Sequence, residues 1–297
     1  MRLITFIPQS GAAPRVGLLR DGNQVIDLTN VQPRPPFDPA DMIALINAGD
    51  SARNWLRDIA AKSRESVPLD KVTLLAPIPR PRKNVFCVGW NYLEHFNESA
   101  HKRPADFKLP DHPVFFTKAP TAVNGPNAAI PYQSDYAQSL DWEVELGVII
   151  GKAGKNISEA DAMKHVFGYT VVNDVTVRDF QSQHGGQWFK GKSLDGTCPM
   201  GPSIATADEI DAGSLQVICR VNGVVKQDSN TQFLFFKIPR LIAELSLGLT
   251  LEPGDIISTG TPSGIGRHRK PPEFMKPGDV METEIVGLGL MRNPIVQ

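Results

Sequence analysis

Cysteine is scarce in this chain, with three residues among 297. They are widely spaced and odd in number, which argues against a disulfide framework and against a cysteine-based zinc site. We therefore expect all three to be small buried hydrophobic side chains in a reducing compartment: Cys87, Cys198 and Cys219.

Excess charge of one sign is also missing, because 31 basic and 32 acidic residues leave a formal net charge of −1. No block of like charge stands out, so the chain lacks the electrostatic footprint of a protein that binds nucleic acid or an anionic membrane. The expected partner is a small molecule.

Long apolar runs are absent as well. A membrane-spanning helix needs roughly 20 apolar residues, and the longest runs here are short pieces such as Leu146–Ile150. The first twenty residues contain arginines and no acid, as a transit peptide does, but Val16–Leu28 predicts two short strands about an Asp21-Gly22 turn. We expect a folded N-terminus and a cytoplasmic protein.

Prolines divide the chain into two parts. Residues 1–76 predict a small α+β domain, with three strands and a helical pattern from Asp41 to about Ser63. Three alternate prolines then occupy 77–83, and each disfavours helix in the residue before it, so this segment predicts an extended linker. Residues 84–297 would form the catalytic domain. The N-terminal strands are expected at Leu3–Ile7, Val16–Leu19 and Gln24–Leu28.

The second part consists mainly of short apolar runs separated by turns, which predicts an α+β, mainly β fold. Helical patterns interrupt these runs at Ser158–His165 and Lys237–Leu247, where Ser158 is a plausible N-cap and Pro239 suits a first turn. The strands are expected at Asn84–Val88, Val114–Phe116, Val144–Ile150, Tyr169–Val172, Gln216–Val221, Asp255–Ser258 and Val280–Ile285.

Two acids alternate along the most informative run, Asp141–Gly151. On a strand, Glu143 and Glu145 would share one face, and two converging carboxylates repel unless a cation or a basic group lies between them. Magnesium, manganese or calcium would suit such oxygen ligands. The ordinary alternative, which this run alone favours, is that both glutamates are solvated on the open face of an edge strand.

A third acid follows the apolar run Tyr169–Val172, in the pair Asn173-Asp174. A buried strand commonly delivers a ligand or catalytic group at its C-terminal end, although Asn-Asp is equally ordinary in turns. Asp174 alone therefore does not distinguish a ligand or catalytic group from an ordinary turn residue.

Five short motifs in order resemble the fumarylacetoacetate hydrolase family over 84–297. None is specific by itself, but their common order makes the resemblance strong. They are Asn91-Tyr92-x-x-His95-x-x-Glu98, Glu143-x-Glu145, Asp174-x-x-x-Arg178-Asp179-x-Gln181, Gly191-Lys192-Ser193 and Thr259-Gly260-Thr261-Pro262.

The resemblance implies a mixed β-roll catalytic domain, preceded by the small N-terminal domain, and a homodimer. It also implies a Mg²⁺ or Mn²⁺ ion, with Ca²⁺ as an alternative, held by Glu143, Glu145 and Asp174. The larger hydrolases of the family add a fourth acid ahead of the histidine, whereas Gly89-Trp90-Asn91 has none here. Three carboxylates, water and substrate would then complete the coordination.

The resemblance further implies roles for individual residues. His95 and Glu98 would form a dyad that activates water, with Lys192 close to the substrate oxyanion or carboxylate. The ordinary alternatives are a surface histidine and a solvated lysine. Substrate contacts are expected from Arg178, Gln181, Tyr92, Thr259, Gly260 and Thr261. His165, His184 and His268 match no role and are taken as structural or exposed, and Trp188 and Phe189 as pocket or core residues.

By the same resemblance, the expected activity is metal-dependent hydrolysis of a carbon–carbon bond in an acylpyruvate or fumarylacetoacetate-like 2-oxo acid, through a metal-bound enolate, as in aromatic catabolism. The same site would serve as an oxaloacetate decarboxylase, a hydroxymuconate-type diacid isomerase or decarboxylase, or a keto-deoxy sugar-acid hydrolase or dehydratase. A non-catalytic binding protein on an enzyme fold is a further alternative, disfavoured because the full set of candidate site residues is present.

Overall fold

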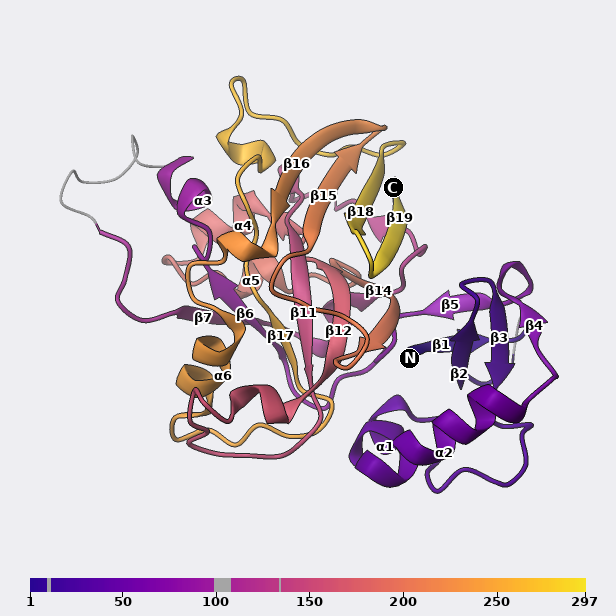
Figure 1. Cartoon of the computed structure of the whole chain (residues 1–297). Helices are drawn as coiled ribbons and strands as arrows, with labels where there is room; N and C mark the ends of the chain where they lie inside the picture. The colour runs from indigo at the N-terminus through magenta and orange to yellow at the C-terminus, as the bar shows by residue number, and fades with distance from the viewer. Residues whose placement is uncertain (10–11, 99–107, 134) are drawn as a thin grey trace.

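The computed structural model describes residues 1–9, 12–98, 108–133 and 135–297 (Figure 1). Within these ranges twelve strands form one sheet in the order β4-β3-β2-β1-β14-β12-β11-β17-β6-β7, with β5 beside β1 and β8 beside β14. Most neighbours are antiparallel, but β17 pairs with β6 in parallel. The strands are β1 (Arg2–Ile7), β2 (Arg15–Arg20), β3 (Gln24–Asp27), β4 (Val67–Pro68), β5 (Thr73–Leu75), β6 (Val85–Gly89), β7 (Val114–Lys118), β8 (Val123–Asn124), β11 (Val144–Ile150), β12 (Val166–Asn173), β14 (Cys198–Thr206) and β17 (Ile256–Ser258).

A second sheet of five described strands, in the order β16-β15-β18-β19-β9, packs on the first, with β15 against β11 and β18 against β12. Its strands are β9 (Ile130–Pro131), β15 (Gln216–Val221), β16 (Val224–Asn230), β18 (Val280–Ile285) and β19 (Gly289–Val296), and a short ladder joins β10 (Leu140–Asp141) to β13 (Thr176–Val177). The helices are α1 (Met42–Asn47), α2 (Gly49–Lys62), α3 (Leu93–Glu98), α4 (Arg178–Gln183), α5 (Phe189–Lys192) and α6 (Ile238–Ser246). The fold is therefore α+β and mainly β.

The N-terminal part has the expected hairpin, since Asp21 and Gly22 both take positive φ between β2 and β3. The single helix expected from Asp41 to Ser63 is wrong in one respect. The chain forms two helices, because Gly49 adopts a φ of 57°, which breaks the helical path after α1.

The N-terminal strands continue the large sheet, because β1 pairs with β14. A single hydrophobic cluster joins Leu45 and Leu56 of the helices to Ile149 and Phe167 of the central strands. The division at 77–83 stays a prediction.

The strands expected between residues 84 and 285 all form, as does the helix at Lys237–Leu247, which is α6. The helix expected at Ser158–His165 is wrong. Ser158 accepts a hydrogen bond from the Asp161 N–H, and only a 3₁₀ turn at Ala162–His165 follows, because side-chain bonds of Asp161 to Ser158 and Lys164 favour local turns over a helix.

All three cysteines are buried, as expected, and none forms a disulfide within the described residues. No helix within the described ranges combines the length and apolar character required to span a bilayer.

Candidate active site

The acidic strand β11 lies in the interior of the sheet, between β12 and β17. Its register places Val144 opposite Asn173, and the Asp174 N–H donates to the Glu143 carbonyl at 2.8 Å. Asp174 therefore lies beside Glu143 across the ladder, with Glu145 two residues along. This strand is not at an edge, so the solvated alternative for the glutamates is excluded.

The three carboxylates converge in the interior. Glu143, Glu145 and Asp174 are 5%, 2% and 0% exposed, and each offers an oxygen within 4.8 Å of the other two. Buried charge of one sign is costly unless opposite charge accompanies it. This cluster therefore requires cations.

Basic side chains surround two of the three acids. The Lys192 ammonium lies 2.6 Å from both Glu143 Oε2 and Asp174 Oδ2. Arg178 donates to Glu143 Oε1 at 2.6 Å, and Lys118, fully buried, places its Nζ 2.8 Å from Asp174 Oδ1. These contacts balance Glu143 and Asp174 but leave Glu145 without a basic group within 4 Å among the described residues.

The pKa values follow this division. Burial alone would raise the pKa of Glu143, yet the adjacent Lys192 and Arg178 hold it well below its ordinary value. The pKa of Glu145 is raised well above its ordinary value by burial and by the charges of Asp174 and Glu143. Glu145 accepts hydrogen bonds from Ser258 Oγ and the Gly260 N–H, at 2.6 and 2.9 Å, and these do not offset the repulsion.

The cluster fits a divalent cation. Asp174 Oδ1 is buried and accepts no hydrogen bond, although the Lys118 ammonium forms an ion pair with it at 2.8 Å. This oxygen, together with Glu145, which has no basic partner, leaves acceptor capacity that a hard cation would satisfy, and an all-oxygen donor set suits Mg²⁺ or Mn²⁺. Glu143, Glu145 and Asp174 would hold the ion.

The loop after β17 supports the acidic strand through a close backbone approach. Gly260 has a φ of 100°, and a Cβ there would lie 2.8 Å from the Cβ of Asn91. Asn91 Nδ2 donates to the Thr259 carbonyl at 2.8 Å, and Thr259 Oγ1 donates to the Leu146 carbonyl. Only glycine permits this packing, which aims the Gly260 N–H at Glu145.

Arg178 is held in place by a fourth buried acid. Its Nε donates to Asp141 Oδ2 at 2.8 Å, while the backbone N–H groups of Gly266 and Arg267 donate to the same carboxylate. Asp141 therefore fixes the arginine that faces Glu143 and anchors the start of the Gly266 turn.

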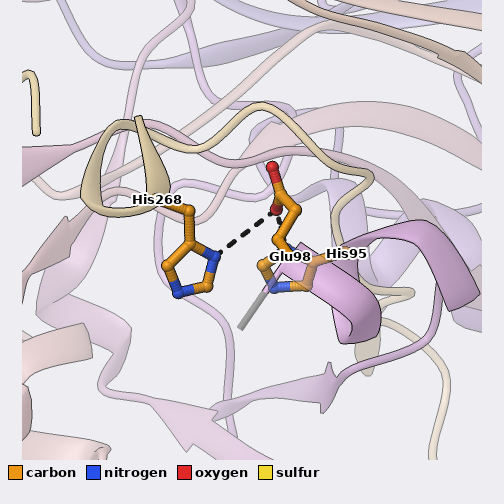
Figure 2. A group of neighbouring side chains, drawn as sticks. All are labelled: His95, Glu98 and His268. Carbon is orange, nitrogen blue, oxygen red and sulfur yellow. Dashed lines mark hydrogen bonds and ion pairs between the residues drawn. The ribbon is translucent and has the colours of Figure 1, made fainter. Parts of the chain in front are cut away.

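A second cluster, shown in Figure 2, contains the expected dyad. His95 on α3 places Nδ1 2.9 Å from Glu98 Oε2, and the Gly264 N–H donates to the other carboxylate oxygen at 2.6 Å. His268, expected to be structural or exposed, is partly buried, and its Nδ1 lies 3.5 Å from Glu98 Oε2, the oxygen that His95 also contacts. Burial would raise the pKa of Glu98, but contacts with His268, His95 and Gly264 lower it to about 2.

A cavity of about 540 Å³ joins the two clusters. Seven of the expected site residues line it, and so do Arg267, His268 and a mainly aromatic wall of Trp90, Phe116 and Trp188. The seven are His95, Glu143, Glu145, Arg178, Gln181, Lys192 and Thr261.

Other expected substrate contacts do not reach the cavity wall. Tyr92 is 2% exposed and its backbone bridges to Leu234, and Thr259 and Gly260 face β11. Tyr92, Thr259 and Gly260 therefore support the neighbouring backbone and do not line the cavity. Phe189 is exposed and lies outside the lining, as do His165 and His184.

Sequence reasoning missed several residues of the site. Asp141 could have been found, because it extends the alternation of Glu143 and Glu145 by one more acid. Lys118 ends an ordinary apolar strand, and nothing in the local pattern indicates that it meets Asp174. Arg267 and His268 lie on a turn that only the fold brings to the cavity.

A buried cluster of three carboxylates that could hold a cation and the His95–Glu98 pair lie beside one cavity, an arrangement typical of an enzyme active site. Residues 84–296 match the family model described as "Fumarylacetoacetate (FAA) hydrolase C-terminal". The chain belongs to the fumarylacetoacetate hydrolase family.

Two relatives match over nearly their whole length. The chain is 42% identical over 299 residues to "Oxaloacetate tautomerase fahd2, mitochondrial" of Xenopus laevis, covering 100% of this chain and 90% of that protein. It is 41% identical over 293 residues to "Oxaloacetate tautomerase YisK" of Bacillus subtilis (strain 168), covering 94% of this chain and 95% of that protein.

Solved structures share the fold. Fumarylacetoacetate hydrolase from Exiguobacterium antarcticum superposes with a TM-score of 0.82 at 37% identity, covering 100% of this chain and 99% of that one. Maleylpyruvate hydrolase from Sphingobium sp. SYK-6, in complex with manganese(II) ion and pyruvate, gives 0.79 at 31% identity with the same coverage.

Proposed function

We propose that this enzyme is a divalent-cation-dependent tautomerase that interconverts the enol and keto forms of oxaloacetate. The observation that supports the proposal is the shared cavity, which is lined by Glu143 and Glu145 of the carboxylate cluster and by His95. The names of the two relatives, both oxaloacetate tautomerases matched across nearly the whole chain, supply the substrate. Carbon–carbon hydrolysis was the activity expected from the sequence. Tautomerisation of oxaloacetate is instead closer to the oxaloacetate and isomerase activities that were the alternatives.

The reaction moves one proton and breaks no carbon–carbon bond. In the enol-to-keto direction the C2 hydroxyl loses its proton, its electron pair forms the carbonyl, and C3 takes up a proton through the electrons of the C2–C3 double bond. The site must therefore lower the energy of the enolate and supply a group that gives and takes a proton.

The residues divide these tasks. A bound divalent cation would supply Lewis-acid stabilisation of the charge on the C2 oxygen and orient the 2-oxo acid. Lys192 and Arg178 bring positive charge to the lining of the same cavity. Glu98 engages Nδ1 of His95, which leaves Nε2 toward the cavity to exchange the proton with the substrate.

The test is to follow the ketonisation of enol oxaloacetate by its ultraviolet absorbance. We expect protein loaded with Mg²⁺ or Mn²⁺ to exceed both the chelator-treated protein and the same concentration of free ion by at least about tenfold, because a positioned acid–base group contributes more than that. A rate no higher than that of the free ion would refute the proposal.

Hydrolysis of an acylpyruvate is the second candidate, favoured by the His95–Glu98 distance of 2.9 Å, which suits activation of a water molecule, and by the likeness to a maleylpyruvate hydrolase. Release of pyruvate from acylpyruvates, without faster ketonisation of oxaloacetate, would select it. Release of pyruvate and CO₂ from oxaloacetate would instead identify a decarboxylase. A cytoplasmic location and a homodimer stay predictions.

A further inference from the structure

Arg267 lines the same cavity as the carboxylate cluster and carries the opposite charge. Its side chain is partly buried, and within the described ranges no carboxylate lies within 4 Å of its guanidinium. The other arginine of the cavity, Arg178, is paired with Asp141 and Glu143. An arginine that lines a ligand cavity without an acidic partner is a ready receptor for an anion.

Gln181 fixes where that receptor lies. Its Oε1 accepts from Arg178 at 3.0 Å and from Arg267 at 3.4 Å, so one oxygen bridges the two guanidinium groups. Arg267 is therefore linked to Arg178 through the side chain of Gln181, and Arg178 contacts Glu143 directly. Because Gln181 Oε1 faces the arginines, its amide nitrogen is left as a donor toward the cavity that Gln181 also lines.

The Arg267 backbone is fixed independently of its side chain. Its N–H donates to Asp141 Oδ2 at 3.0 Å, and the Gly266 N–H donates to the other oxygen at 2.6 Å. Arg267 therefore lines the cavity from an anchored turn, an arrangement suited to selecting substrates.

We propose that Arg267, with Gln181, binds the second carboxylate of a dicarboxylic 2-oxo acid whose 2-oxo acid end faces Glu143 and Glu145. This subsite makes the enzyme selective for diacids over monoacids of the same chain length. The inference rests on the proposed function for its placement of the 2-oxo acid end, and it concerns binding, so it is tested separately from turnover.

The test compares two four-carbon acids by calorimetry on Mn²⁺-loaded protein: oxaloacetate, and 2-oxobutanoate, which has a methyl group where oxaloacetate has its distal carboxylate. We expect wild-type protein to prefer the diacid by about tenfold or more, the usual effect of a hydrogen-bonded charge pair. Arg267→Gln should remove most of this preference by weakening oxaloacetate alone, and Arg267→Lys should retain part of it. Arg269→Gln is the matched control, because Arg269 lies outside the cavity lining and donates to the Lys226 carbonyl.

Equal binding of the two acids by wild-type protein, or binding of neither, would overturn the subsite. So would an Arg267→Gln variant that keeps the preference or loses affinity for both acids equally. Failure of the tautomerase proposal gives a different pattern: the Arg267-dependent preference persists while enol oxaloacetate is not ketonised faster than with free Mn²⁺.

Discussion

The Lys192 ammonium lies 2.6 Å from Asp174 Oδ2, so a lysine of α5 supplies positive charge to an acid that follows β12. The same nitrogen is 2.6 Å from Glu143 Oε2. Burial would lower the pKa of Lys192, but Asp174 and Glu143 raise it well above its ordinary value, so the side chain stays charged. A divalent cation held by this cluster would therefore interact with the same carboxylates as Lys192.

Lys192→Met should destabilise the metal-free protein by about 3–5 kcal/mol, because it removes one partner of a buried charge network. Mn²⁺ should then raise the melting temperature of the variant by more than it raises that of the wild type, since the ion replaces the missing charge. Turnover should be lost even with Mn²⁺ bound. The measurement is thermal unfolding with and without Mn²⁺, with Lys190→Met, at an exposed position, as the control. An equal Mn²⁺ response in both proteins would contradict this account.

Glu145→Gln should separate metal binding from stability. The amide keeps an oxygen to accept from Ser258 and Gly260, and it removes the charge that Asp174 and Glu143 repel. We expect the metal-free variant to be more stable than wild type by roughly 1 kcal/mol, or about 2–4 °C, and to bind Mn²⁺ more than about a hundredfold more weakly, because a ligand is lost.

Glu282→Gln, on β18 outside the cavity, is the control for that variant and should change neither quantity. Calorimetric titration with Mn²⁺ and thermal unfolding measure the two effects. A less stable variant that still binds Mn²⁺ normally would show that Glu145 is a structural acid.

His95→Asn should leave Mn²⁺ affinity unchanged and lower kcat by about a hundredfold or more, the usual contribution of a positioned acid–base group. The exposed His184 offers a matched control, and His184→Asn should have wild-type kcat. Steady-state ketonisation kinetics and Mn²⁺ titration distinguish the outcomes. If His95→Asn kept its kcat, another group would have to move the proton.

Glu98 predicts an acid-dependent loss of stability. Its pKa in the folded protein is about 2, against an ordinary value of 4.5, so the folded state favours the carboxylate. The stabilisation is therefore fully present above about pH 4.5 and is lost as the pH falls toward 2. Wild type should exceed Glu98→Gln by roughly 1–2 kcal/mol at pH 6, after allowance for partial solvent screening.

That difference should shrink steadily as the pH is lowered from 5 toward 3, as measured by urea unfolding at each pH. A difference that stayed constant over this range would show that Glu98 stabilises the protein by packing and not by its charge.

Much of this site could be predicted from local sequence pattern. Glu143 and Glu145 alternate on a strand, and Asp174 follows another strand, so the sequence pattern alone indicates all three as candidate ligands. Their convergence was not, because it depends on the register that pairs Val144 with Asn173. The ordered motifs supplied that missing information.

Contacts between segments that are far apart in the sequence could not be predicted from local pattern. Lys118 and Asp174 are 56 residues apart in the printed sequence, and they meet although β11, β17 and β6 lie between β12 and β7 in the sheet. His268 reaches Glu98 across 170 positions, and no spacing rule covers such a pair. Local rules also failed at Ser158–His165, where side-chain hydrogen bonds favour a turn over the helix that the apolar pattern indicated.

The central claim is that the cluster of Glu143, Glu145 and Asp174 holds a cation that acts with His95 on enol oxaloacetate. The most direct test measures Mn²⁺ binding and ketonisation on the same samples of wild type, Glu145→Gln and His95→Asn. We predict that wild type does both, Glu145→Gln neither, and His95→Asn only the first. Ketonisation by wild type that survives complete removal of Mn²⁺ would contradict the account.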